Sequence, residues 1–192
     1  MKNTYISFSI CLLLLSSVSS CTQKIYLKRI ETYFNASSAE MKAKYMADDY
    51  RSYFAEKKDE GEDKTSSLQS FLKWDAPLHP DVKILHYSVD KNKWTIELNE
   101  QNDFTKPIGF PGWNAKEVIS LNKKGFIKEA IYIPDPPNPP YKKWLQPAVD
   151  WLQKNIPDSL RDVYQNGKLI QTESTAKESV RLLKYWHETS AK

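Results

Sequence analysis

The sequence predicts an α+β fold, in which three N-terminal helices pack on a curved antiparallel sheet and a helical extension follows. Three observations support this class. Before residue 80, apolar residues recur at the three- and four-residue spacing of a helix face. Between residues 82 and 133 they alternate along pairs of segments joined by short turns. After residue 134 a run of prolines ends the sheet, and helical spacing then returns.

Each of the three N-terminal helices is marked by an apolar face and by polar residues at its ends. The first starts near Ile25, a few residues after Cys21. The second is capped by Ser37 or Ser38, and the third by Thr65 or Ser66. We expect the second helix to end near residues 48–50 and the third to be closed by the prolines at 77 and 80. The inward residues are Leu27, Ile30 and Phe34 in the first helix, Met41 and Tyr45 in the second, and Leu68, Phe71 and Leu72 in the third.

Two hairpins make up the predicted sheet. The first joins Val82–Asp90 to Lys93–Asn102, and the second joins Lys116–Asn122 to Phe126–Ile133 through a turn that ends in a glycine. The segment Phe104–Trp113 between the hairpins contains two prolines and two glycines. It is either a broken edge strand or a loop over the sheet.

The proline-rich segment Pro134–Pro140 separates the sheet from the rest of the chain. It favours neither helix nor strand pairing and acts as a stiff spacer. Beyond it we predict a helix around Trp144–Leu152, a short helix from Pro157, a turn at Asn166-Gly167 and a last helix over Glu173–Glu188. The predicted organisation is therefore an α+β domain over 21–135 and a linker with a helical extension over 136–192.

The first 20 residues have the order of a secretory signal. Lys2 precedes an apolar run from Ile6 to Val18, which is too short to cross about 30 Å of hydrocarbon. The tetrapeptide Val18-Ser19-Ser20-Cys21 resembles a bacterial lipobox, and this resemblance implies that Cys21 is acylated and becomes the first mature residue. We therefore expect a signal peptide over 1–20 and a lipid-anchored protein of the bacterial cell envelope, facing the periplasm or the exterior.

Composition excludes several classes of function. Lys2 is the one charged residue before Cys21, so the chain from Cys21 onward keeps a formal net charge of +3 out of the +4 of the whole sequence. This mild and scattered basic excess gives no support for nucleic-acid binding. The second cysteine, Cys11, leaves with the signal, so no disulfide is expected. The three histidines lack ligand spacing, and neither a phosphate-binding loop nor a nucleophile elbow is present. We expect no metal and no cofactor.

The second hairpin carries a resemblance to a known family. The run Val118-Ile119-Ser120-Leu121-Asn122-Lys123-Lys124-Gly125-Phe126-Ile127 and the end Tyr132-Ile133-Pro134-Asp135 resemble the last hairpin of the nuclear transport factor 2-like, or SnoaL-like, α+β cone. The resemblance covers Ile25–Asp135. It implies the cone fold and leaves activity open, because that superfamily contains steroid isomerases, polyketide cyclases, dehydratases and non-catalytic modules.

Regular pairing of the first hairpin places its apolar residues on one side. With a turn at Lys91-Asn92, the expected apolar pairs are Val89 with Trp94, Tyr87 with Ile96, and Leu85 with Leu98. We take this side as the cone interior, with Tyr87 and Trp94 as candidate pocket residues. The opposite side pairs His86 with Glu97, which we interpret as a solvated pair rather than a catalytic dyad.

Regular pairing of the second hairpin places Glu117 and Glu129 on one mostly apolar face. Burial raises the pKa of a carboxyl group and so tunes it for proton transfer. Alternatively, both are edge residues that reach solvent. Glu117 and Glu129 are therefore candidate pocket residues without an assigned catalytic role.

The leading hypothesis for function is a non-catalytic module that binds a small apolar ligand or a protein partner at the membrane surface. An alternative is an isomerase, cyclase or dehydratase in which Glu117 or Glu129 is the general base. A third is a structural module that forms a homodimer.

Overall fold

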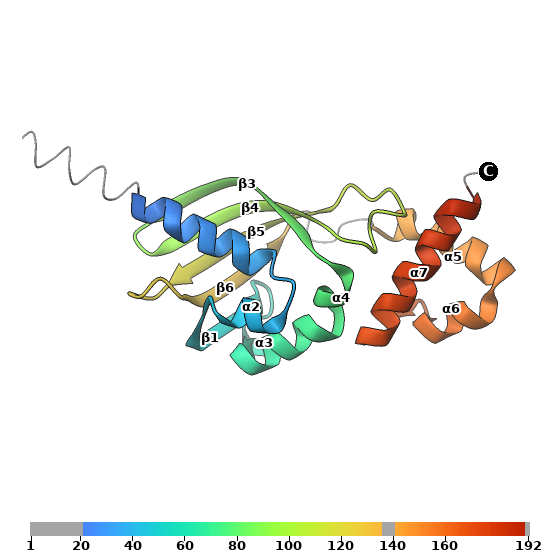
Figure 1. Ribbon diagram of the computed structural model, residues 1–192, viewed down its shortest axis with the longest axis horizontal. Coiled ribbons are helices and arrows are strands. Elements are labelled where there is room, and N and C mark those ends of the chain that lie inside the picture. Colours follow the sequence, from blue (N-terminus) through green and yellow to red (C-terminus); the bar gives the residue numbers. More distant parts are fainter. Residues whose placement is uncertain (1–20, 136–140, 191–192) are drawn as a thin grey trace, which may run out of the picture.

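The computed structural model describes residues 21–135 and 141–190, and its elements form a helix-covered sheet with a helical extension (Figure 1). The signal peptide predicted over 1–20 and most of the proline-rich segment lie outside the described residues. Within the described residues the first helix covers 21–34, so no spacer separates Cys21 from the helix. The helical elements before the sheet's hairpins are α2 (Ala39–Ala43), η1 (Lys58–Glu60), α3 (Lys64–Ser70), the π-helical turn η2 (Phe71–Asp75) and α4 (Ala76–Leu78).

The main sheet has six strands in the order β2-β1-β6-β5-β4-β3. The strands are β1 (Met46–Phe54), β2 (Glu62–Asp63), β3 (Asp81–Asp90), β4 (Lys93–Gln101), β5 (Trp113–Leu121) and β6 (Ile127–Pro134). The fold class predicted from the sequence is confirmed, and both hairpins lie where they were expected. The sheet is mixed rather than antiparallel, because β1 pairs with β6 in the parallel direction.

Strand β1 corrects the prediction for the second helix. Ser38 does cap α2, accepting a hydrogen bond from the Met41 N–H, but that helix ends after one turn and β1 begins at Met46. The adjacent acids Asp48 and Asp49 are poor strand formers. Pairing of β1 with β6 outweighs this local preference, because the strand buries Met46 and Tyr50 in the core.

The core of the cone lies between the first helix and the inner face of the sheet. Trp94, Ile96 and Leu98 alternate along β4 and are almost fully buried. Ile30, Tyr33 and Phe34 of the first helix pack against them. The period-2 pattern of β4 and the helical spacing of the first segment therefore meet in one apolar cluster.

Two β-bulges change the register that regular pairing predicts. In the first hairpin Ile84, not Leu85, lies opposite Leu98, and Leu85 is 63% exposed. In the second hairpin Leu121 lies opposite Ile127 while Ser120 lies opposite Glu129. A bulge adds one residue to one strand, so the side chains beyond it swap faces.

The C-terminal extension consists of three helices and a short hairpin. Its elements are α5 (Tyr141–Asn155), α6 (Pro157–Val163), β7 (Tyr164–Gln165), β8 (Lys168–Leu169) and α7 (Glu173–Ser190). The segment between the two sheet hairpins is a loop, and its Phe104, Ile108 and Phe110 pack against Leu145 of α5 and Leu183 of α7. The extension is therefore packed onto the cone at this loop and at α4 (Figure 1).

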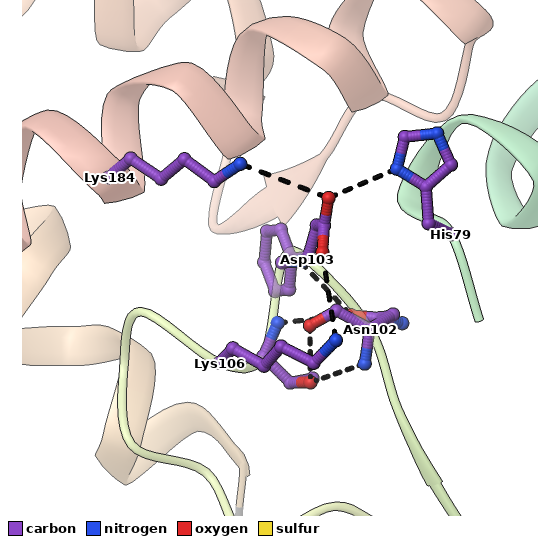
Figure 2. A network of polar contacts seen from close by, with 7 residues as sticks. His79, Asn102, Asp103, Lys106 and Lys184 are labelled. Atoms are coloured by element: carbon purple, nitrogen blue, oxygen red, sulfur yellow. Dashed lines mark hydrogen bonds and ion pairs between the residues drawn. The ribbon is translucent and has the colours of Figure 1, made fainter. Parts of the chain in front are cut away.

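A polar network joins the extension to the cone beside this apolar contact. Figure 2 shows Asp103, in the loop after β4, with His79, Lys106 and Lys184 around its carboxylate. One carboxylate oxygen lies 3.0 Å from His79 Nδ1 and 3.8 Å from Lys184 Nζ of α7, and the other lies 3.8 Å from Lys106 Nζ. Burial alone would raise the pKa of Asp103, but these three groups outweigh burial and hold the pKa below its ordinary value.

Candidate functional site

The open end of the cone contains two adjoining cavities of about 800 and 500 Å³. Both are lined by residues of the first helix, α2, η2, β5 and β6. The exposed residues Ala55, Glu56 and Lys57, which follow β1, line the larger cavity and mark its mouth. Cavities of this size accommodate small organic molecules.

Aromatic rings form much of the shared wall. Phe54 and Tyr132 meet edge to face with their ring centroids 5.2 Å apart, and Phe71 and Trp74 of η2 line the opposite side. Tyr33 and Tyr50 lie deeper, with their hydroxyl oxygens 2.7 Å apart. The π-helical turn matters here because it places Phe71, Trp74 and Asp75 at the cavity within five residues.

Lys42 of α2 projects its amino group into this aromatic wall. Its Nζ lies 4.1 Å from the centroid of the Tyr33 ring and 4.8 Å from that of Phe71, and it donates to the main-chain oxygen of Tyr33 at 3.4 Å. Such cation–π contacts stabilise the charged form of the amine. Burial nevertheless lowers the pKa of Lys42, and the charges of Glu117, Asp75 and Glu100 oppose that effect.

Three carboxyl groups share the cavities with Lys42, and burial raises the pKa of each. The pKa of Glu117 is raised to about 8, with Lys42 opposing the rise and Glu100 adding to it. The pKa of Glu100 is raised to about 7 by burial and by the charge of Asp75. Burial also raises the pKa of Asp75. Groups that exchange protons near neutral pH in a cleft are typical of functional sites.

Of the four candidate pocket residues from the sequence, the structure places Glu117 in the cavities and the other three elsewhere. Glu117 lies opposite Tyr132 on the inner face of β5 and β6. Trp94 is 1% exposed and belongs to the core, where the ring of Tyr87 stacks on it from the neighbouring strand with the centroids 5.6 Å apart. Tyr87 itself is 39% exposed.

Glu129 is separated from Glu117 by the bulge in the second hairpin. Regular pairing would put both carboxylates on one face, but the register shift places Glu129 opposite Ser120. The Glu129 carboxylate accepts a hydrogen bond from the Ser120 hydroxyl at 3.3 Å. It also accepts one from the Tyr53 hydroxyl at 3.0 Å. The His86–Glu97 pair has the expected register on the outer face, and Glu97 lies 3.5 Å from Lys116.

Sequence reasoning missed Lys42, Glu100, Asp75 and the tyrosine pair. One signal was available for Glu100, because it continues the alternation Trp94, Ile96, Leu98 on the inner face of β4. No such signal existed for Lys42. The predicted second helix turns Met41 inward, whereas the single turn of α2 leaves Met41 exposed and directs Lys42 to the cavity.

Across residues 21–135 and 141–190, no group of three or more His, Cys, Asp or Glu side chains is placed to hold a metal ion. In the same ranges no helix is long and apolar enough to span a membrane. Cys21 is exposed and unpaired by a disulfide at the start of the first helix.

Comparison with known proteins gives structural similarity alone. No family model matches the chain, and no curated protein matches its sequence. Among solved structures, an NTF2-like protein of unknown function from Cytophaga hutchinsonii has 9% identity and a TM-score of 0.44, covering 58% of this chain and 90% of its own.

Two further structures show the same level of similarity. The epoxide hydrolase/cyclase-like enzyme SalBIII of salinomycin pyran ring formation has 13% identity and a TM-score of 0.48, covering 58% of this chain and 92% of its own. A putative polyketide cyclase from Sinorhizobium meliloti has 14% identity and a TM-score of 0.43, covering 55% of this chain and 93% of its own. Identities and TM-scores this low say nothing about activity.

Proposed function

We propose that the protein binds a small molecule in the open end of the cone, one with an apolar ring body and a polar group that accepts hydrogen bonds. The observation that carries this is the placement of Lys42 and Glu117 in an aromatic-lined cavity of about 800 Å³. At neutral pH a carboxyl group with a pKa of about 8 is mostly protonated and donates a hydrogen bond. Lys42 is a second donor, so an acceptor such as a carbonyl oxygen fits between them.

Binding is tested with prodan, a naphthyl ketone whose fluorescence shifts to the blue in an apolar site. We expect saturable binding and a loss of affinity of about tenfold on Lys42→Met, the effect of one lost charge-assisted hydrogen bond. The matched control is Lys44→Met, because Lys44 is exposed and pairs with Glu40. Equal affinity of the wild type and the Lys42→Met variant would argue against this site.

A second candidate function is proton transfer to or from the bound molecule. The specific observation in its favour is that the pKa values of Glu117 and Glu100, about 8 and about 7, bracket neutral pH. A group with such a pKa both gives and accepts protons efficiently at neutral pH. In this case Glu117 exchanges an α-proton of an enolisable ketone with solvent.

Proton transfer is tested by following deuterium incorporation into 2-acetylnaphthalene in heavy water. We expect Glu117→Gln to abolish exchange while leaving prodan affinity within a few-fold, since Gln still donates a hydrogen bond. Glu129→Gln is the control, because Glu129 lies on the outer face and bonds Tyr53. An exchange rate that never exceeds the buffer rate in the wild type leaves binding as the function.

The lipid anchor is a separate part of the proposal. We propose that Cys21 carries the lipid and holds the protein at a membrane of the bacterial envelope, supported by the residues that precede it and by its exposure. Acyl chains bury about 0.8 kcal/mol per methylene, so their loss releases the protein. After Cys21→Ser, cell fractionation should recover mature-sized protein in the soluble fraction, and retention in the membrane pellet would contradict acylation.

A further inference from the structure

One end of the molecule collects basic side chains from three segments that are far apart in the sequence. These segments are the start of the first helix, the β3–β4 turn and the β5–β6 turn (Figure 1). We call this surface the basic end. Its cations are the exposed Lys24, Lys28, Lys91, Lys93, Lys123 and Lys124, with the half-buried Arg29 between them.

Contacts on the backbone hold the three segments together. The Leu121 N–H donates to the Asn92 carbonyl at 3.0 Å, and the Asn92 side chain donates to the Leu121 carbonyl at 3.0 Å, which joins the two turns. Arg29 Nη1 donates to the carbonyl oxygen of Lys124 at 3.2 Å. The basic end is therefore a fixed surface of the fold rather than a set of independent loops.

Gly125 allows the first helix to approach the β5–β6 turn this closely. Its φ of +78° is left-handed, and a Cβ there would lie 2.4 Å from the ring of Tyr26. Any other residue would push the helix away from the turn. The close approach brings Tyr26 and Arg29 of the helix against the turn that carries Lys123 and Lys124.

Most of this charge is not neutralised within the protein. Lys28 lies 3.5 Å from Glu31, and Asp90 lies opposite Lys93 in the strand register. Among the described residues, the amino groups of Lys91, Lys93, Lys123 and Lys124 form no ion pair within 4 Å. A local excess of cations in a chain of modest net charge has to be balanced by an outside partner or by salt.

The chain itself indicates what lies at this end. Cys21 is the first described residue of the first helix and lies at this end, and the apolar run over 6–18 precedes it in the sequence. If Cys21 carries the lipid proposed above, this end of the fold lies next to the membrane. Lysine and arginine side chains close to a membrane surface are attracted to anionic lipid headgroups by about 1 kcal/mol each.

We propose that the basic end is a membrane-facing surface that binds anionic lipid headgroups and fixes the orientation of the cone. Strands β1 and β6 run parallel, and both lead from this end toward the cavity mouth. The mouth, with Glu56 and Glu60 among its lining residues, therefore faces away from the membrane. The ligand enters from the aqueous phase rather than from the bilayer. This inference goes beyond ligand binding in the cavity and relies on the anchor only for the choice of membrane as the partner.

The test is amine acetylation of the full chain bound to vesicles, read residue by residue by mass spectrometry. Vesicles of phosphatidylcholine alone are compared with vesicles that also contain phosphatidylglycerol. On the anionic vesicles we expect acetylation of Lys91, Lys93, Lys123 and Lys124 to slow about tenfold, and high salt to abolish the difference. The exposed reference lysines of the extension, Lys142, Lys143, Lys154 and Lys168, should react equally on both. Equal acetylation rates at the basic end on both vesicles would overturn the proposal. That result would favour an acidic protein as the partner instead.

A pair of charge-reversal variants separates the surface from the total charge. The first replaces Lys91, Lys93, Lys123 and Lys124 by Glu, and the second does the same at the four reference lysines. Lys24 and Lys28 remain as reporters in both. We expect them to lose their protection on anionic vesicles in the first variant and to keep it in the second. Loss in both variants would mean that net charge, not this surface, governs contact. A failed anchor is recognised separately, because the protein then fails to float with vesicles of phosphatidylcholine alone.

Discussion

The cone and the C-terminal extension bury their residues in different ways. The cone places Lys42, Glu100 and Glu117 beside aromatic rings in a cavity that water reaches. The extension packs Leu145, Ala148, Leu152, Val180 and Leu183 into dry apolar clusters. Among the described residues, Ser179 Oγ of α7 is the one buried side-chain polar atom without a hydrogen-bond partner.

This difference separates a site from its support. Burying ionisable groups lowers stability unless ion pairs or hydrogen bonds compensate, whereas apolar packing raises stability directly. The extension contacts η2 and α4 through α7, and η2 carries Phe71, Trp74 and Asp75 of the cavity wall. We infer that the extension holds that wall in place. Four predictions test the contrast, from the largest expected effect to the smallest.

The largest effect is expected in the extension. Leu183→Ala removes a side chain that is 3% exposed within the cluster against Phe104 and Phe110, and it should cost about 3 kcal/mol of unfolding free energy. The control is Leu85→Ala, the same change at the bulged, 63% exposed position on β3, which should cost about 0.5 kcal/mol or less. Urea denaturation gives both values. Similar costs for the two would show that the extension is loosely attached.

In the cone, Glu117→Gln should stabilise the protein at alkaline pH. The pKa of Glu117 rises from 4.5 to about 8 on folding, so between these values the folded state holds a proton that the unfolded chain has released. Stability contributed by this group is therefore lost as pH rises from about 4.5 to about 8. Gln has no proton to lose, so at pH 8 the variant should exceed the wild type by a few kcal/mol, on the order of 1.4 kcal/mol for each unit of pKa shift. Melting curves from pH 5 to about 8 measure this, and parallel pH profiles would show that the carboxyl group is not buried.

The tyrosine pair tests whether the polar floor of the cavity is a connected network. The hydroxyl oxygens of Tyr33 and Tyr50 are 2.7 Å apart, so Tyr33→Phe should cost about 1 kcal/mol. Tyr50→Phe removes the same hydrogen bond from the other side. Because the two changes share one interaction, the double variant should cost less than the sum of the two. Additive costs would mean that the hydroxyl groups do not interact.

The smallest effect is expected at the polar network that joins the two regions. Asp103→Asn removes a carboxylate that is 25% exposed and faces His79, Lys106 and Lys184 (Figure 2). Partly exposed ion pairs contribute little, so the cost should be about 1 kcal/mol or less and should shrink in high salt. The pKa of Asp103 is held below 3.8, so its contribution is present above that pH and is lost below it. If Asp103→Asn lowered the unfolding free energy more than Leu183→Ala, the polar network rather than apolar packing would be the main attachment of the extension.

The amino-acid sequence determined the fold class and the two hairpins. These features follow from periodicity and from turn residues, which act within a few positions of the chain. The Ser38 cap and the turn before Gly125 are examples, since each is satisfied by neighbours in sequence. The orientation of Glu117 toward the inner face of the sheet also followed from its position on an alternating strand.

The tertiary structure alone decided β1, the two bulges and the placement of Lys42 in the site. Strand β1 forms because β6 offers a partner about 80 residues away, against the local preference of Asp48 and Asp49. The bulge before Glu129 inserts a single residue that no pattern marks, and it moves that carboxylate to the outer face. Lys42 reaches the cavity because α2 stops after one turn to let β1 begin. In each case the deciding energy comes from contacts between segments distant in sequence, and local residue patterns carry no information about them.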